Sequence, residues 1–523
     1  MRIGKLTDHV RIAFRLLLTV LALHLWSQAT LAGTTSVTAT KDNNTPANVT
    51  EAFFSIVQAQ DIFWTALYSG SATDGHSVFV SHSNAFLNEF ALTTTGGGGG
   101  KFHLAPGSYQ ISIRYFSMGP GSYTVKYDPT GNGANNGDPH ITTVDGIHYD
   151  FQSAGEFVAL RDGHGMEIQT RQTPISTAPP IANPYTGLIS GVSLNTAVAA
   201  RVGHHRVTYQ FAGSQRDNGF QIRIDGARIV LPPFGQYLGS GGFVGPSAGG
   251  GVRTQFANGT ILIVTPQFWD SQKRWYLNLD VYGTPAHAGI MGLISPDGWL
   301  PALPNGQSVG PRPDALHDRF VTLYAKFAEA WRVTDKTSLF DYAGGTSTAT
   351  FTLLDWPREA PPFTVPDSEP ATPISLAAAQ RACYSIKMKA LREDCVFDVQ
   401  VTGSVGFARN YQQIQKIRLS ATAITLNERH ESKSTDARWP MTVQVRALAA
   451  NEKIIPGGTV QLFVDAMASG LPVPLDTHGR ATLKNYRHIR ERQIISVRYA
   501  PAKGIIFLPS IAFAHESPES DLR

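Results

Sequence analysis

The chain is poor in cysteine and in charge. Its 523 residues include only 2 cysteines, and Asp, Glu, Lys and Arg together make up 16% of the sequence. So few cysteines exclude a disulfide-dense scaffold, which means that packed hydrophobic cores must stabilise the fold. The net charge of +4 is spread over the whole length. It gives no reason to expect a nucleic-acid partner.

Long hydrophobic runs are missing after the N-terminus. No later stretch reaches the roughly 18 apolar residues that a membrane helix needs. Residues 1–32 have the features of a secretory signal peptide: a basic start, an apolar stretch over 16–26 and a cleavage site ending at Ala32. We therefore expect a secreted, extracellular or cell-envelope protein with no transmembrane segment after signal removal. A retained N-terminal anchor is the alternative.

Glycine and proline are abundant, at 49 and 32 residues, which favours many short strands joined by turns. A chain this long cannot form one hydrophobic core. We therefore expect a mainly β, multidomain protein. Composition places linkers at 128–136 and 358–373 and divides the rest into four parts. These are a jelly-roll-like β-sandwich (33–130), a central β unit (137–357), a short helical segment with both cysteines (374–411) and an immunoglobulin-like β-sandwich (412–512).

The central unit opens on a specific motif. Residues 137–146 read GDPHITTVDG, followed by YDF at 149–151 and GEF at 155–157. This order resembles the start of the von Willebrand factor type D (VWFD) domain. Residues 327–333 resemble the strand that closes bacterial versions of that domain, and residues 395–403 resemble the cysteine-bearing segment that often follows it. The resemblance covers about 137–410.

The resemblance implies a structural rather than a catalytic function. Members of the VWFD family are mostly extracellular and serve in adhesion and assembly, so we expect a secreted or cell-surface structural or adhesive interaction protein without catalysis. Its partner would be an extracellular protein or glycan. The alternative is a secreted hydrolase with accessory β-modules. Residues 245–249 match the G-x-S-x-G pattern around Ser247, but no helix follows, so we expect a hairpin loop there.

Many VWFD domains hold one calcium ion, and the resemblance points to its ligands. Asp145 matches the acid of the opening motif, while Asp297 and Asn305 lie near the expected late loop. Leu293 stands where the family commonly has Asn. Calcium needs about six or more oxygen ligands, so we expect weak binding or none, and no other cofactor.

The two cysteines, Cys383 and Cys395, are close in sequence. In an oxidising compartment they are expected to form a local disulfide. The bond would join the short helix expected after Ser375 to a strand beginning at Val396.

The motif also predicts a reaction of the chain on itself. Asp138-Pro139-His140 resembles the sequence at which some family members cut their own backbone between Asp and Pro. The Asp138 side chain can attack its own main-chain carbonyl, and His140 can give a proton to the proline nitrogen. The alternative is that the motif only shapes the entry to a strand, leaving Asp138 and His140 as structural residues.

Overall fold

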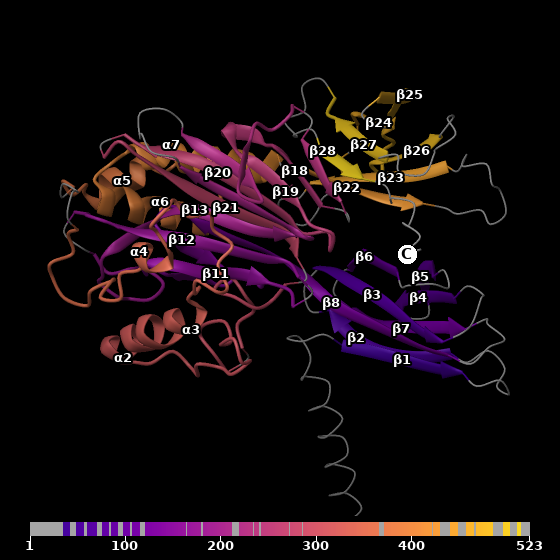
Figure 1. Ribbon diagram of the computed structural model, residues 1–523, viewed down its shortest axis with the longest axis horizontal. Coiled ribbons are helices and arrows are strands. Elements are labelled where there is room, and N and C mark those ends of the chain that lie inside the picture. Colours follow the sequence, from indigo (N-terminus) through magenta and orange to yellow (C-terminus); the bar gives the residue numbers. More distant parts are fainter. Residues whose placement is uncertain are drawn as a thin grey trace, which may run out of the picture. The chain divides into compact units, whose positions relative to one another are not determined.

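The computed structural model of the protein is mainly β, with several antiparallel sheets and few helices (Figure 1). The structure describes residues 131–428 apart from 212–218, 366–370 and a few single positions, most of 440–502, and 510–513. Between residues 35 and 130 it describes the backbone of the strands. The expected signal peptide at 1–32 lies outside the described residues. Among these residues, no helix has the length and apolar character needed to span a bilayer.

The N-terminal unit, Met1–Thr130, contains two antiparallel sheets. One has the strand order β2-β7-β4-β5, and in the other β1 and β3 pair with β8 while β6 pairs with β3. The bounds are β1 (Thr35–Lys41), β2 (Val49–Ile56), β3 (Gln60–Gly70), β4 (His76–His82), β5 (Ala85–Leu92), β6 (Gly98–Leu104), β7 (Gly107–Tyr115) and β8 (Gly121–Asn136).

The boundary between the two units, Thr130/Gly131, falls inside the linker predicted at 128–136, but this segment is a strand and not a loop, because β8 runs through it to Asn136. Its last residues pair with a strand of the central unit, and Asn135 exchanges side-chain hydrogen bonds of 3.2 and 2.8 Å with Asn195. Ladder hydrogen bonds use the backbone, so a polar, glycine-rich sequence can still form a strand. A side chain at Gly131 would collide with the Val144 carbonyl, which explains the glycine there.

The central unit is built from two antiparallel sheets around one core. Buried side chains from both sheets, such as Phe157, Leu160, Val198, Leu262 and Leu279, form this core. The first sheet contains β9 (His140–Thr142), β10 (His148–Asp150), β17 (Gln236–Gly239), β18 (Gly242–Pro246), β19 (Val252–Gln255), β20 (Ile261–Trp269) and β21 (Arg274–Thr284). The second contains β11 (Gly155–Arg161), β12 (Glu167–Ile175), β13 (Val192–Val202), β14 (His205–Phe211), β15 (Phe220–Ile224) and β16 (Ala227–Ile229).

Strand β20 explains how the helices attach to the central unit. Leu262 and Val264 belong to the core between the sheets, whereas Ile261 and Ile263 contact Ile417 of helix α7. Successive side chains of a strand point to opposite faces, so an apolar run such as this one is buried on both. Figure 1 shows α5, α6 and α7 gathered at one end of this unit.

The segment at 327–333, predicted as a strand, is mostly helical. Leu323, Tyr324, Phe327 and Trp331 are buried along a continuous helical stretch, and only Arg332 forms a bridge, to Phe157. Their spacing of three to four residues is typical of one helix face. The helices are η1 (Ala248–Gly250), α2 (Leu316–Phe320), η2 (Val321–Ala328), α3 (Glu329–Trp331), α4 (Thr348–Phe351), α5 (Leu376–Ala382), α6 (Lys389–Thr402) and α7 (Gly406–Ser420).

The cysteine-bearing segment contains more helix than predicted. The Ser375 side chain caps α5 by accepting a hydrogen bond from the Ala378 amide, as expected. Val396, however, lies inside α6 and not at the start of a strand, and α7 continues to Ser420. The apolar residues of 395–414 pack on Trp269 and Tyr276 of the sheet, and this packing favours helices over strands.

The C-terminal β unit consequently begins at residue 422 and not at 412. It has a sheet of three strands and a sheet of four, which share a core of Val443, Val445, Leu462 and Tyr499. The predicted two-sheet arrangement is therefore present. The bounds are β22 (Thr422–Glu428), β23 (Pro440–Ala447), β24 (Thr459–Val464), β25 (Met467–Pro474), β26 (Arg480–Lys484), β27 (Ile495–Ala500) and β28 (Ser510–Phe513).

Candidate functional site: a buried histidine among four carboxylates

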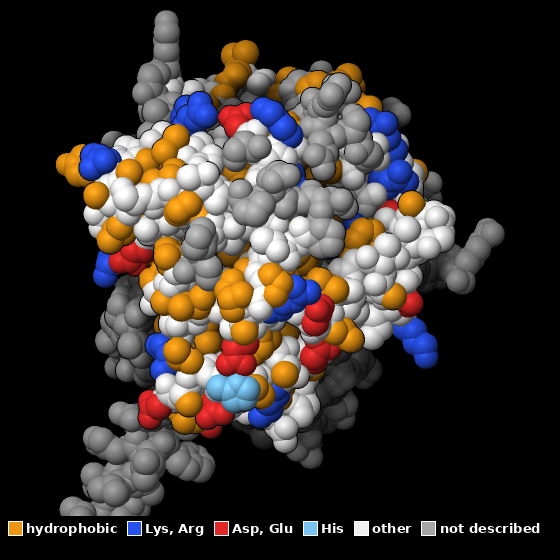
Figure 2. Space-filling model, turned by 90° about the vertical axis from the view of Figure 1, so that its left-hand side faces the viewer, with side chains coloured by type: hydrophobic (Ala, Val, Ile, Leu, Met, Phe, Trp, Pro, Cys, Tyr) orange, Lys and Arg blue, Asp and Glu red, His pale blue; other side chains and the backbone are white. Residues whose placement is uncertain are grey.

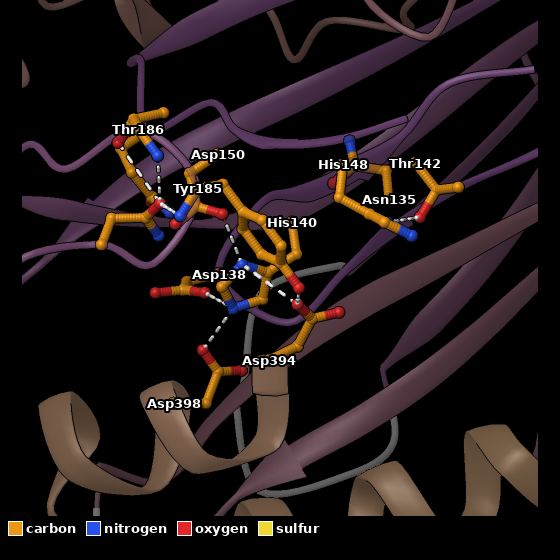
Figure 3. A network of polar contacts seen from close by, with 12 residues as sticks. Asn135, Asp138, His140, Thr142, His148, Asp150, Tyr185, Thr186, Asp394 and Asp398 are labelled. Carbon is orange, nitrogen blue, oxygen red and sulfur yellow. Dashed lines mark hydrogen bonds and ion pairs between the residues drawn. The ribbon is translucent and has the colours of Figure 1, made fainter. Parts of the chain in front are cut away.

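His140, the first residue of β9, lies at the centre of a buried polar cluster (Figure 3). Its Nε2 atom is 2.6 Å from Asp138 Oδ1 and 3.0 Å from Asp398 Oδ1. Its Nδ1 atom is 2.7 Å from Asp150 Oδ1 and 3.9 Å from Asp394 Oδ1. Four carboxyl groups therefore surround one imidazole ring.

The cluster joins two distant parts of the sequence. Asp138 lies in the turn between β8 and β9, and Asp150 is the last residue of β10, which pairs with β9 in register with His140. Asp394 and Asp398 lie on α6, four residues apart, which places them on the same helix face. All five side chains are at most 6% exposed, so the site is closed to solvent.

Two tyrosines hold the helix-borne carboxylates from outside. Tyr411 of α7 donates a hydrogen bond of 2.7 Å to Asp398 Oδ2. Tyr185, from the loop between β12 and β13, donates one of 2.9 Å to Asp394 Oδ1. A hydroxyl donor keeps a buried carboxylate partly satisfied and fixes its direction.

The Asp138 carboxyl contacts the ring directly, with Oδ1 2.6 Å from His140 Nε2, but no hydroxyl or backbone amide among the described residues donates a hydrogen bond to it. The turn around it is held by its backbone instead. The Gly137 amide donates to Asn278 Oδ1 at 2.8 Å, and the Phe151 amide donates to the Pro139 carbonyl at 3.0 Å.

The cluster retains protons at higher pH than its isolated groups would. Burial, followed by repulsion from Asp398, raises the pKa of Asp138 well above its usual range. Burial likewise raises the pKa of Asp150, and that of Asp394 to about 6. Burial alone would lower the pKa of His140, but the four carboxylates outweigh it and hold that pKa well above its usual range. The ring is therefore a proton carrier at neutral pH.

Asp138, His140 and Asp398 present ligand atoms within 4.8 Å of one another, close enough to hold a metal ion. Nε2 is nevertheless 2.6 and 3.0 Å from the two oxygens, which are hydrogen-bond distances. Around a tetrahedral ion with bonds of about 2.0–2.1 Å, ligand atoms stand about 3.3 Å apart. The observed arrangement is thus that of a hydrogen-bonded acid–base cluster.

A groove of about 470 Å³ lies beside α6. Phe397 lines it, and the His140 ring packs edge-on against Phe397 with centroids 5.7 Å apart. One aromatic side chain therefore lies between the groove and the histidine. Figure 2 faces the end of the unit where these helices lie, and hydrophobic side chains are exposed there among charged ones.

The residues expected to bind calcium do not converge. Asp145 accepts hydrogen bonds from Thr143 Oγ1 at 2.5 Å and from the Ile294 amide at 3.3 Å. Asn305 is hydrogen-bonded within its own turn to Gln307, and Asp297 is exposed. Asp145 therefore reaches the loop after Leu293, but no contact joins it to Asp297 or Asn305 among the described residues.

The structure confirms the predictions made for Ser247 and for the two cysteines. Ser247 lies in the hairpin loop between β18 and β19, followed only by the three-residue helix η1, so the hairpin interpretation is confirmed. Cys383 and Cys395 form a disulfide with a Cα–Cα distance of 6.0 Å, and both residues are fully buried. It links the end of α5 to the middle of α6.

Sequence reasoning missed three of the five cluster residues: Asp150, Asp394 and Asp398. Asp150 belongs to the YDF part of the motif, so the pairing of β9 with β10 could have been proposed from the sequence. Asp394 and Asp398 flank Cys395 with helical spacing. Interpreting that stretch as a strand concealed their common face.

No description of a known protein family matches the chain. Over 298 residues, 56% of its length, the chain is 25% identical to Sushi domain-containing protein 2 of Homo sapiens, and it spans 33% of that relative. Among solved structures, a pre-peptidase C-terminal domain of collagenase from Bacillus anthracis has 15% identity over 18% of this chain and 90% of its own, with a TM-score of 0.16. A cycloisomaltooligosaccharide glucanotransferase from Paenibacillus has 11% identity over 50% of this chain and 45% of its own, with a TM-score of 0.15. Scores this low carry no argument about fold or function.

Proposed function

We propose that the chain is a secreted or cell-surface structural interaction protein with a VWFD-like central unit, and that it does not turn over an external substrate. The observation that carries this proposal is the closure of the His140 cluster, whose side chains are at most 6% exposed. An enzyme needs its acid and base within reach of the substrate. A sealed cluster favours a role within the chain itself.

A further feature supports an extracellular role. The disulfide between Cys383 and Cys395 is typical of proteins that fold in an oxidising compartment. The partner we expect is an extracellular protein or glycan.

The test compares producing cells with cells that lack the gene and with cells complemented by the full chain. Protease added outside intact cells should remove the protein, and loss of the gene should reduce attachment or aggregation. A protein that survives external protease would contradict the proposal. So would hydrolysis of ester, glycoside or peptide substrates that His140→Gln abolishes, since that result would support the hydrolase alternative.

A second function is favoured by the state of Asp138: we propose that the chain cuts its own backbone once, between Asp138 and Pro139. The Asp138 carboxyl is buried beside the bond that it would attack, and its Oδ1 is 2.6 Å from Nε2 of His140, the proton carrier of the cluster. The nucleophile is already part of the bond that it attacks, which replaces a bimolecular encounter by an internal one.

The reaction balances without a co-reactant other than water. A side-chain oxygen of Asp138 bonds to its own main-chain carbonyl carbon and forms a cyclic anhydride. The C–N bond to Pro139 breaks, and its electron pair stays on the proline nitrogen, which takes a proton from His140. Water then opens the anhydride, leaving two carboxyl groups on Asp138 and returning a proton to the site.

Asp138→Asn and Asp138→Glu test this reaction. Asn removes the carboxylate nucleophile, and Glu keeps the acid but displaces it by one carbon. Denaturing electrophoresis should show two fragments from the wild type, none from the Asn variant and much less from the Glu variant. Equal cutting of all three chains would indicate a contaminating protease.

A further inference from the structure

Helices α6 and α7 supply half of the cluster around the Asp138–Pro139 bond. Asp394 and Asp398 come from α6, and Tyr411, the donor to Asp398, comes from α7. Figure 3 shows Asp394 and Asp398 approaching the histidine from the side of the helices. The bond and its surroundings are thus assembled from residues far apart in the sequence.

Asp398 touches the cleavable turn directly. A Cβ atom on Gly137 would lie 2.6 Å from the Tyr411 hydroxyl and even nearer to Asp398 Oδ2. Both distances are shorter than the contacts that real Cβ atoms make. Gly137 has φ +60, a backbone conformation that glycine adopts readily. The backbone that leads into Asp138 therefore rests on the Asp398–Tyr411 pair.

Asp398 also decides where the His140 proton points. Nε2 carries a single hydrogen, and its hydrogen bond goes to Asp398 Oδ1. Asp150 binds the other ring nitrogen at 2.7 Å, so the ring is held from both sides. Asp398 Oδ1 and Asp138 Oδ1 lie 3.0 and 2.6 Å from the same nitrogen, so Asp398 helps to set the direction of the ring beside the Asp138 carboxyl.

The disulfide fixes the element that carries Asp398. Cys395 lies between Asp394 and Asp398 on α6 and is joined to Cys383 at the end of α5. The segment packs on Trp269 and Tyr276 of the sheet. Only when this segment has folded onto the sheet can Asp398 reach His140.

We infer that Asp398, clamped by Tyr411, is the positioning residue for cleavage at Asp138–Pro139, and that the disulfide-bonded segment 376–420 switches the site on when it docks. This inference rests on the proposed self-cleavage. It implies that the chain stays intact during synthesis and is cut only after export, oxidation and complete folding.

The test measures the rate at which a new N-terminus at Pro139 appears in full-length protein, by mass spectrometry at pH 5. Asp398→Asn keeps the size of the side chain and should slow cleavage at least about tenfold, which is less than the roughly 10²–10⁴-fold of direct acid–base catalysis because Asp398 acts through His140. Tyr411→Phe keeps the ring, removes the clamp and should slow it about threefold or more. Asp398→Glu should restore part of the rate that Asn loses.

Asp341→Asn is the matched control. Asp341 is a hydrogen-bonded carboxylate of the same unit, 9% exposed, but its partners are Arg206 and Thr208 and not the histidine. Its cleavage rate should match the wild type. Thermal unfolding of every variant shows whether it is folded at the assay temperature.

A second readout separates positioning from general loosening of the fold. Among the described residues, the titratable groups facing His140 are Asp138, Asp150, Asp394 and Asp398, with Tyr185 and Tyr411 behind them and His148 close enough for the charge of His140 to add to burial in lowering its pKa. Removing the Asp398 charge takes away one of the groups that keep the ring protonated. The pH–rate profile of Asp398→Asn should therefore move to lower pH, whereas loosening alone lowers the rate at every pH.

Each outcome is decisive. If the wild type cleaves and folded Asp398→Asn cleaves equally fast with the same pH profile, the positioning role is overturned and the self-cleavage stands. If the wild type never cleaves, both are overturned. If Asp398→Asn does not fold, Tyr411→Phe decides, and an unchanged rate in that variant contradicts the inference.

Discussion

The Asp398 carboxylate accepts a hydrogen bond of 3.0 Å from His140 Nε2 although 258 residues separate the two in sequence. This contact connects the opening motif of the central unit to the disulfide-bonded helices. It means that the chemistry of the Asp138–Pro139 turn depends on a segment that is synthesised much later. The following predictions test separate parts of that arrangement.

Asp394 should make the stability of the protein depend on pH. Burial raises its pKa from 3.8 to about 6, so between these values the folded state binds a proton that the unfolded state releases. The stabilisation of the folded state by this proton is complete below about pH 4 and is lost as the pH rises through 6. Relative to Asp394→Asn, the wild type should lose about 3 kcal/mol of unfolding free energy between pH 4 and pH 7. Urea unfolding at several pH values measures this, and parallel curves for the two proteins would contradict it.

Gly137→Ala should destabilise the protein more than Gly146→Ala. Both glycines have positive φ, +60 and +83, but only Gly137 is crowded, while a Cβ on Gly146 meets nothing within 4 Å. We expect about 1 kcal/mol for the backbone strain alone at Gly146 and at least about 2 kcal/mol at Gly137. Equal losses of unfolding free energy in urea would mean that the Asp398–Tyr411 pair does not press on the turn.

The disulfide should protect both thiols and stabilise the fold. Alkylation of unfolded, unreduced protein should label neither Cys383 nor Cys395, because they are bonded to each other. Replacing both by alanine should cost about 3 kcal/mol, the chain-entropy value for a loop of this size. Two labelled cysteines per chain would refute the bond.

Calcium should have little effect on stability. Asp145 is hydrogen-bonded to Thr143 and Ile294, and Asn305 to Gln307, so the structure assembles too few free oxygens. The melting temperature with calcium and with chelator should agree within about 2 °C, since a ligand that binds only the folded state must raise it. A larger rise that Asp145→Asn abolishes would restore the calcium site.

The sequence predicted the class of fold better than the site. Alternating apolar residues identified many strands, and Ser375 marked the start of α5. The segments around Phe327 and Val396 were misjudged because a short apolar run can be buried equally well as a strand or as a helix. Only tertiary packing decides between them: Phe327 packs in the core between the sheets, and Val396 packs with the cluster around Trp269 and Tyr276. Asp138 and His140 were identified from their motif. Asp394 and Asp398 could not be, because their proximity to His140 depends on how distant elements dock.

The most direct test of the central claim is the intact mass of purified full-length protein after incubation near pH 5 and near pH 7.5, measured under denaturing conditions. Denaturation is needed because Asn135 and Asn136 pair with strands β21 and β9, so the two fragments should stay together in the native state. One proton must reach the proline nitrogen, and a lower pH makes that proton more available to a cluster in which burial already raises the pKa of Asp138 above its usual range. We therefore predict two fragments, the second beginning at Pro139, that form several times faster near pH 5. A single unbroken mass at both pH values would contradict the account and leave Asp138 and His140 with a structural role alone.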